Sequence, residues 1–210
     1  MKFIIFLMAP AVMLLSVLFI LSGLYITVTS ESFQLRELDK LGIGNEFGID
    51  ISKYHSDVLS YLNGKSDSMP MDIVLNEKEL IHMRDVRNAF SLLSNVFNAI
   101  LFSYLLLLTI IYIFSGGIKM PAFALMYTGI LSLVLALAIT LIGFDSVFTN
   151  FHLLFFEGDS WLFNPDENII KIYSIEFFWS MFERSIAFDI VIILSAVIPG
   201  ILWKENLLKE

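Results

Sequence analysis

Four long stretches with almost no charge restrict the fold of this sequence more than any other feature. They cover approximately residues 3–28, 92–117, 121–144 and 186–203, and Asp189 in the fourth is the one charged residue within them. Each is close to or above the roughly 20 residues that a helix needs to cross a bilayer. Continuous apolar runs fit helices and not the alternating strands of a barrel. The sequence therefore predicts an all-α integral membrane protein with four transmembrane helices.

Composition agrees with a single membrane domain over residues 1–210. Hydrophobic residues make up 57% of the chain and charged residues only 16%, which is unusual for a soluble domain of this size. The chain has no cysteine, which excludes disulfides, thiolate nucleophiles and thiolate metal sites. The first apolar stretch is longer than the 7–15 residues typical of a signal peptide, so we expect a retained helix.

Basic residues near the ends of the stretches predict the orientation. Lys2, Lys119, Lys204 and Lys209 fall together if the N- and C-termini are both cytoplasmic, as the positive-inside rule favours. Two extracytoplasmic loops, approximately 29–91 and 145–185, would then form a small cap. They hold nine basic and eighteen acidic residues, so no basic surface for nucleic acid is expected.

The first of these loops contains two predicted helical elements. Residues 50–63 have apolar side chains at helical spacing and end at an Asn-Gly turn. Asn76, followed three residues later by Glu79, is typical of a capping box, so a second helix should begin near Glu77 and continue into the second apolar stretch. His55, in the first of these helices, is interpreted as a solvated surface residue.

Two of the three histidines fall at the predicted outer boundary of the membrane. His82 lies three residues before Asp85, and His152 lies seven residues after Asp145, so each histidine shares a helical face with a carboxylate if the segment is helical. The two segments are attached to different membrane stretches and could meet. A histidine accepts and returns a proton near neutral pH, and a carboxylate can fix its tautomer. A proton-transfer site is one interpretation, and amphipathic anchoring in the headgroup layer is the other.

Other site classes have less support. His82, Asp85, His152 and Asp145 could in principle bind a metal, but no zinc signature is present, and we expect neither metal nor cofactor. The sequence also lacks a Gly-x-Ser-x-Gly elbow, a Ser-x-x-Lys pair and a glycine-rich phosphate loop.

Polar residues form a stripe on the second predicted membrane helix. Such residues normally face other helices or a wet cavity, and helix-to-helix contact is the favoured interpretation. Asn95 and Asn98 are candidate partners for Asp189. The stripe comprises Arg84, Arg87, Asn88, Ser91, Asn95 and Asn98. Trp161, Trp179 and Trp203 suit the interfacial aromatic belt.

Two motifs in this order resemble the lipoprotein intramolecular transacylases of low-GC Gram-positive bacteria. They are His82-Met83-x-Asp85-Val86 before the second span and Phe148-x-x-Phe151-His152, followed by Phe156 and Trp161, after the third. The similarity in order and hydropathy extends over most of the chain. The family tends to have a proline before the Phe-Phe pair of the last span, whereas this chain has Ser174-Ile175-Glu176 before Phe177-Phe178.

The resemblance implies an acyltransferase without a cofactor in a bacterial cell membrane. Its substrate would be a diacylglyceryl-modified lipoprotein within membrane lipid. The sn-2 acyl chain would move to the α-amine of the N-terminal cysteine of the lipoprotein, giving the lyso-form.

The resemblance also implies roles for individual residues. His82 and His152 would be the general acid and base, in either assignment, at the extracytoplasmic face. Asp85 and Asp145 would orient them, and Arg84 or Arg87 would stabilise an oxyanion or contact a phosphate. Residues expected to contact substrate are Asn88, Phe148, Phe151 and Trp161.

A non-enzymatic lipoprotein-binding chaperone or envelope sensor would have the same topology but would tolerate loss of both histidines. A small transporter would need polar residues through several spans, and the first and third stretches have almost none.

Overall fold

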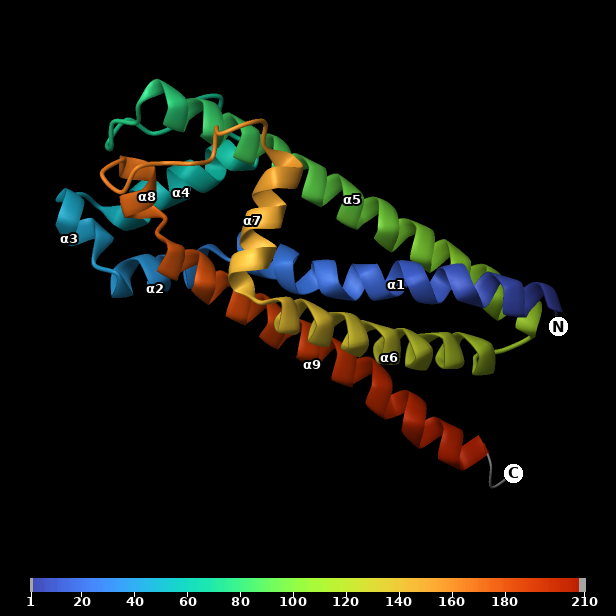
Figure 1. The fold of residues 1–210 in the computed structure, drawn as a ribbon. Coiled ribbons are helices and arrows are strands. Elements are labelled where there is room, and N and C mark those ends of the chain that lie inside the picture. Colours follow the sequence, from blue (N-terminus) through green and yellow to red (C-terminus); the bar gives the residue numbers. More distant parts are fainter. Residues whose placement is uncertain (1, 208–210) are drawn as a thin grey trace. The chain divides into compact units, whose positions relative to one another are not determined.

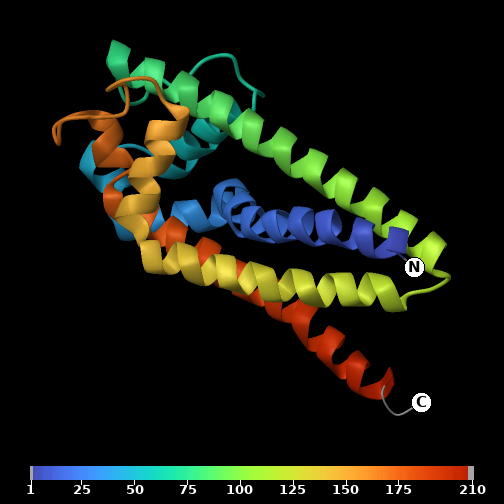
Figure 2. The same ribbon diagram turned by 45° about the vertical axis from the view of Figure 1, so that its right-hand side comes forward.

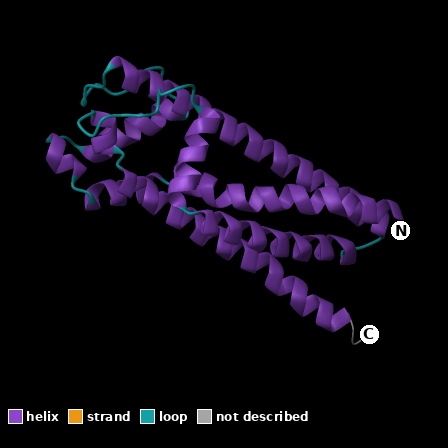
Figure 3. Ribbon diagram, in the orientation of Figure 1, coloured by secondary structure: helices purple, strands orange, loops and turns teal. Residues whose placement is uncertain are grey.

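The structure is a computed structural model that describes the backbone of residues 2–207 and the side-chain surroundings of residues 6–198 and 201. The side chains of Lys2, Trp203 and Lys204, and all of Lys209, lie outside the described residues. In the described part every regular element is a helix (Figure 3). The helices are α1 (Lys2–Thr29), α2 (Glu31–Lys40), α3 (Ile43–Phe47), α4 (Ile51–Leu62), α5 (Glu77–Ser115), α6 (Lys119–Ile142), α7 (Phe144–Phe155), α8 (Asn168–Ile172) and α9 (Ile175–Leu207).

Three helices in the described residues are long and apolar enough to cross a membrane. They are α1 over Phe6–Thr29, α5 and α6. The all-helical membrane fold is therefore confirmed, while a fourth span within α9 stays a prediction. Every charged residue of α5 lies at or before Arg87, so the part of α5 that suits lipid is Leu92–Ser115.

The chain divides into two compact units. The first unit contains residues 1–25, 95–141 and 185–210, and the second contains 26–94 and 142–184. Figures 1 and 2 draw α5 and α9 as continuous helices, and each of them contributes residues to both units. The single membrane domain stays a prediction.

Small residues bring the helices of the first unit together. Ser16 of α1 donates a hydrogen bond to the Thr128 carbonyl of α6 at 3.4 Å. A Cβ atom on Gly129 of α6 would lie 2.3 Å from a methyl carbon of Val197 on α9. Without a hydrophobic driving force in lipid, close packing of small residues and interhelical hydrogen bonds hold helices together.

Asp189 has a different partner from the two asparagines suggested by the sequence. Its side chain is buried, and its Oδ1 accepts a hydrogen bond from the backbone N–H of Gly23 at 2.9 Å. The absence of a side chain on Gly23 permits this approach, because a Cβ there would lie 2.2 Å from the Ser185 carbonyl oxygen. The contact between α1 and α9 therefore depends on glycine at position 23.

The core of the second unit joins α2, α3, α4 and α8 to the starts of α5 and α9. Fully buried members include Leu38, Tyr54, Val58 and Ile172. His55 belongs to this interior, with 1% of its surface exposed, so its interpretation as a solvated residue is wrong. Its Nδ1 lies 3.1 Å from the Tyr173 hydroxyl, and burial lowers the pKa of His55 to about 4. His55 looks polar in the sequence, but its ring packs against Tyr173, which lies far along the chain, with ring centroids 5.9 Å apart.

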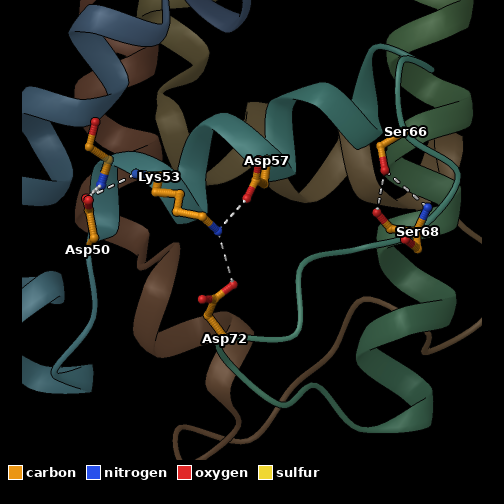
Figure 4. Close-up of polar contacts among 7 residues, drawn as sticks. Asp50, Lys53, Asp57, Ser66, Ser68 and Asp72 are labelled. Atoms are coloured by element: carbon orange, nitrogen blue, oxygen red, sulfur yellow. Dashed lines mark hydrogen bonds and ion pairs between the residues drawn. The ribbon is translucent and has the colours of Figure 1, made fainter.

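The predicted helix at residues 50–63 is present as α4, and its start is fixed by a side-chain cap. The Asp50 carboxylate accepts hydrogen bonds from the Ser52 and Lys53 backbone N–H groups at 3.0 and 3.1 Å (Figure 4). Farther along the exposed face, the Lys53 ammonium pairs with Asp57 at 3.1 Å and lies 4.0 Å from Asp72 (Figure 4). The cap satisfies N–H groups that have no partner within the helix.

A substitution of Gly23 tests the packing of the first unit. Gly23→Ala places a methyl group against a backbone oxygen of α9, so we expect a loss of about 2 kcal/mol or more in stability. The thermal unfolding midpoint in detergent should fall clearly. Gly117→Ala, where a Cβ would meet open space, is the control. Equal midpoints for the two variants would contradict the packing described here.

Substitution of two aspartates distinguishes the effect of the α4 cap from that of a surface ion pair. Asp50→Ala removes the cap and should cost about 1 kcal/mol. Asp57→Ala removes an exposed pair and should change the stability by less than about 0.5 kcal/mol. Thermal unfolding of the two variants in one detergent gives the comparison. A larger loss from Asp57→Ala would mean that the cap is not what fixes this helix.

Candidate active site

The first turns of α5 carry His82. As predicted, Asn76 and Glu79 form a capping box: the Asn76 N–H donates to Glu79 Oε2 at 2.6 Å, and the Glu79 N–H donates to Asn76 Oδ1 at 3.0 Å. This cap fixes where the helix begins and therefore which face His82 occupies. His82 is 8% exposed, and Met83 beside it belongs to the core of the second unit.

α7 carries His152, so this segment is helical, which was the condition for Asp145 and His152 to share a face. Gly143, with φ +84°, separates α7 from α6, and a residue with a side chain would be strained there. α7 has an apolar face on which Phe144 and His152 are buried. His152 is also 8% exposed.

The two histidines lie together in the second unit. Their ring centroids are 6.3 Å apart and the ring planes are inclined by only 13°. The residues come from segments 70 positions apart in the sequence, and both belong to the second unit. The expectation that these two segments could meet is therefore confirmed.

Aromatic rings surround the histidine pair. Phe156 contacts both imidazoles, with centroid distances of 4.8 Å to His82 and 5.1 Å to His152. Trp161 lies 4.8 Å from the His152 ring, and Phe163 lies 5.1 Å from the His82 ring. Sequence reasoning did not identify Phe163, although its position two residues after Trp161 was a usable signal.

Phe148 and Phe151 also border His152. Their ring centroids lie 4.2 and 5.4 Å from that of His152. Together with Trp161 they place three of the four residues predicted to contact substrate around one imidazole. Asn88, the fourth, is exposed on α5.

A backbone hydrogen bond fixes the tautomer of His152. Its Nδ1 lies 2.7 Å from the Phe148 carbonyl oxygen. A carbonyl only accepts, so Nδ1 carries the hydrogen and, in the neutral ring, Nε2 has the free lone pair. The Nδ1 of His82 is enclosed and has no hydrogen-bond partner among the described residues.

Burial disfavours the positively charged form of both imidazoles. Desolvation lowers the pKa of His82 to about 4, and the neighbouring His152 and Lys78 act in the same direction. Desolvation also lowers the pKa of His152, although its bond to the Phe148 carbonyl opposes the shift. Both imidazoles are therefore neutral at pH 7, and a proton placed on either is readily given up.

Among the described residues, the charged side chains assigned to this site by sequence make no hydrogen bond or ion pair with the histidines. In the described part of the chain, no hydrogen bond or ion pair joins Asp85 to His82 or Asp145 to His152. Arg84 is exposed, and Arg87 lies over the Tyr61 ring at 4.8 Å. A backbone carbonyl thus has the orienting position that sequence spacing suggested for a carboxylate.

The donor set does not suggest a metal centre. Among residues whose side chains are described, no group of three or more His, Cys, Asp or Glu side chains has a metal-binding arrangement. The arrangement can instead accept a proton at a neutral imidazole inside an aromatic, poorly hydrated enclosure.

Comparisons with known proteins identify a family for the chain. The family model for lipoprotein intramolecular transacylase Lit matches residues 6–178. Comparison with curated proteins finds no match.

Solved structures of the Lit transacylase from Bacillus cereus have the same fold. A histidine-to-alanine variant superposes with a TM-score of 0.79 at 18% identity, covering 100% of this chain and 97% of that one. A histidine-to-arginine variant has a TM-score of 0.78 at 19% identity, and the match covers 100% of this chain and 96% of that one. A third structure has a TM-score of 0.74 at 21% identity, and the match covers 99% of this chain and 97% of that one. These proteins are described as membrane-integral.

The family match extends over most of the chain and sets aside the chaperone, sensor and transporter alternatives. This membrane protein belongs to the lipoprotein intramolecular transacylase family, and it is an acyltransferase.

Proposed function

We propose that this protein moves the sn-2 acyl chain of a diacylglyceryl-modified lipoprotein to the α-amine of its N-terminal cysteine. The product is a lyso-form lipoprotein with an N-acyl chain. The observation that carries the proposal is the pair of neutral imidazoles, 6.3 Å apart, in an aromatic enclosure. Amine and ester belong to one substrate molecule, so the protein needs no covalent intermediate and positions the two groups.

His152 is the base in this proposal. Its Nδ1 hydrogen is occupied by the Phe148 carbonyl, which leaves the Nε2 lone pair to accept a proton from the α-amine. This transfer accompanies the attack: the unprotonated amine forms the C–N bond to the ester carbonyl while one N–H bond breaks. The structure therefore supports the assignment in which His152, and not His82, accepts the first proton.

In this proposal the proton accepted by His152 passes to His82, and His82 gives it to the glycerol oxygen. Two stacked imidazolium ions would repel each other, so the pair carries one proton at a time. The lowered pKa of His82 makes its protonated form a strong donor. The ester C–O bond breaks as the O–H bond forms, which balances the proton taken from the amine.

The setting in the membrane follows from the same proposal. α9 supplies a fourth span over residues 186–203, both termini are cytoplasmic, and residues 29–91 and 145–185 form an extracytoplasmic cap. The acidic surplus of these two segments and the basic residues Lys2 and Lys119 support this orientation. The histidine pair then meets lipoproteins at the outer surface, and Arg84 is available to a lipid phosphate there.

Substitution of the histidines tests the proposal. His82→Ala and His152→Gln should each reduce formation of lyso-form lipoprotein by about 10²- to 10⁴-fold, the usual contribution of a general acid or base. A glutamine amide does not accept a proton at neutral pH. The measurement is mass spectrometry of a reporter lipoprotein from a strain that lacks the activity.

Asn150→Ala, on the exposed face of the same helix, is the matched control. It should leave the product unchanged, with comparable amounts of each variant in the membrane. Undiminished lyso-form in a histidine variant would remove that residue from the mechanism.

The pH dependence of the rate distinguishes a buried base from an ordinary histidine. The α-amine has a reference pKa of about 8, so the rate should fall about tenfold per pH unit below that value. His152, with its lowered pKa, remains neutral as the pH passes 6.5 and adds no second factor there. In single-turnover assays, log rate should keep a slope of one through pH 6.5. A break to a slope of two at or above pH 6.5 would contradict a desolvated base.

A further inference from the structure

Residues 156–168, here called the cover segment, run from the end of α7 to the start of α8. They carry three aromatic rings that contact the histidine pair: Phe156, Trp161 and Phe163. The segment consists of turns and irregular chain up to residue 168, where α8 begins. Its position over the imidazoles must therefore be fixed by contacts outside itself.

Glu79 makes the most enclosed of these contacts. The residue is 1% exposed and lies one turn before His82 on α5. Its Oε1 accepts a hydrogen bond from the Ile169 N–H of α8 at 2.8 Å. Its Oε2 accepts from the Asn76 N–H at 2.6 Å, which is the ordinary bond of a capping box.

The bond to Ile169 is not needed to cap α5. It joins residues 90 positions apart, so one buried carboxylate accepts charge-assisted hydrogen bonds from the start of α5 and from α8. A neutral amide offers only one oxygen, so it cannot make both bonds. A glutamate at position 79 can therefore cap α5 and also bind α8.

Other, more exposed hydrogen bonds also join the region before His82 to the cover segment and α8. The Asn168 side-chain amide donates to the Val74 carbonyl at 2.8 Å, and the Asn76 amide donates to Glu167 at 3.1 Å. The Lys78 ammonium donates to the Leu162 carbonyl and lies 5.0 Å from the centroid of the Phe163 ring. Unlike Glu79, these side chains lie partly or largely in solvent.

We propose that Glu79 is a positioning residue for the transacylation, because its bond to Ile169 holds the start of α8, where the cover segment ends, against the helical turn that presents His82. The inference rests on the proposed function. Through this bond the segment holds Trp161 against His152 and Phe163 against His82. Loss of the bond lets the aromatic side chains of the cover segment move away from the imidazoles, while both histidines stay on their helices.

The test compares two glutamate substitutions on neighbouring positions. Glu79→Gln removes one of the two backbone bonds, and Glu77→Gln makes the same change in charge at an exposed position of the same turn. We expect Glu79→Gln to lower the single-turnover rate by about tenfold to a hundredfold, as small misplacements do, and Glu77→Gln to leave it unchanged.

A spectroscopic measurement separates positioning from general stability. In a Trp179→Phe, Trp203→Phe background, Trp161 is the remaining tryptophan. Its fluorescence in the folded protein should be quenched more strongly by acrylamide in Glu79→Gln than in the parent or in Glu77→Gln. If Glu79→Gln does not fold, Asn168→Ala should give the same two changes with a smaller size, since it loosens the segment without altering the capping box.

The outcomes distinguish the two proposals. Parent-like rate and quenching in Glu79→Gln, or in Asn168→Ala if that variant must be used, overturn the role of Glu79. Parent-like rate in His152→Gln instead overturns the acid-base function itself. A slow Glu79→Gln with parent-like quenching of Trp161 also overturns the inference, because the loss would not pass through the cover segment.

Discussion

In the proposed mechanism, the chemistry depends on one contact, the hydrogen bond from His152 Nδ1 to the Phe148 carbonyl. It joins residues four apart on α7 and fixes the tautomer of the imidazole, so that the free lone pair is at Nε2. Serine hydrolases use a carboxylate for such orientation. Here a carbonyl does so without adding a negative charge to an aromatic enclosure.

Enclosure in aromatic rings explains why two histidines are useful together. Each is 8% exposed, and desolvation lowers the pKa of both. A neutral pair has one acceptor ready at pH 7, and the second ring makes a shared proton easier to release. In the proposed reaction the substrate supplies both nucleophile and ester, so the protein has to position these two groups and move one proton.

Sequence reasoning found the spans of α1, α5 and α6, the capping box at Asn76, and the meeting of His82 with His152. These follow from local rules or from apolar runs that leave few alternatives. It did not find the bond from Gly23 to Asp189, the burial of His55, or the wall formed by Phe163. Those contacts join distant segments, and side-chain spacing along one helix carries no information about them.

The carboxylates illustrate the limit most clearly. Asp85 and Asp145 share helical faces with the histidines, yet neither is bonded to one, and the orienting acceptor is a main-chain atom that every sequence contains. The most direct test of the account is therefore the protonation of His152 itself, read from the ¹⁵N chemical shifts of labelled histidine in lipid nanodiscs, with assignment by His152→Gln. The account predicts a neutral ring with hydrogen on Nδ1 at pH 7. A hydrogen on Nε2 or an imidazolium ion at that pH would contradict it.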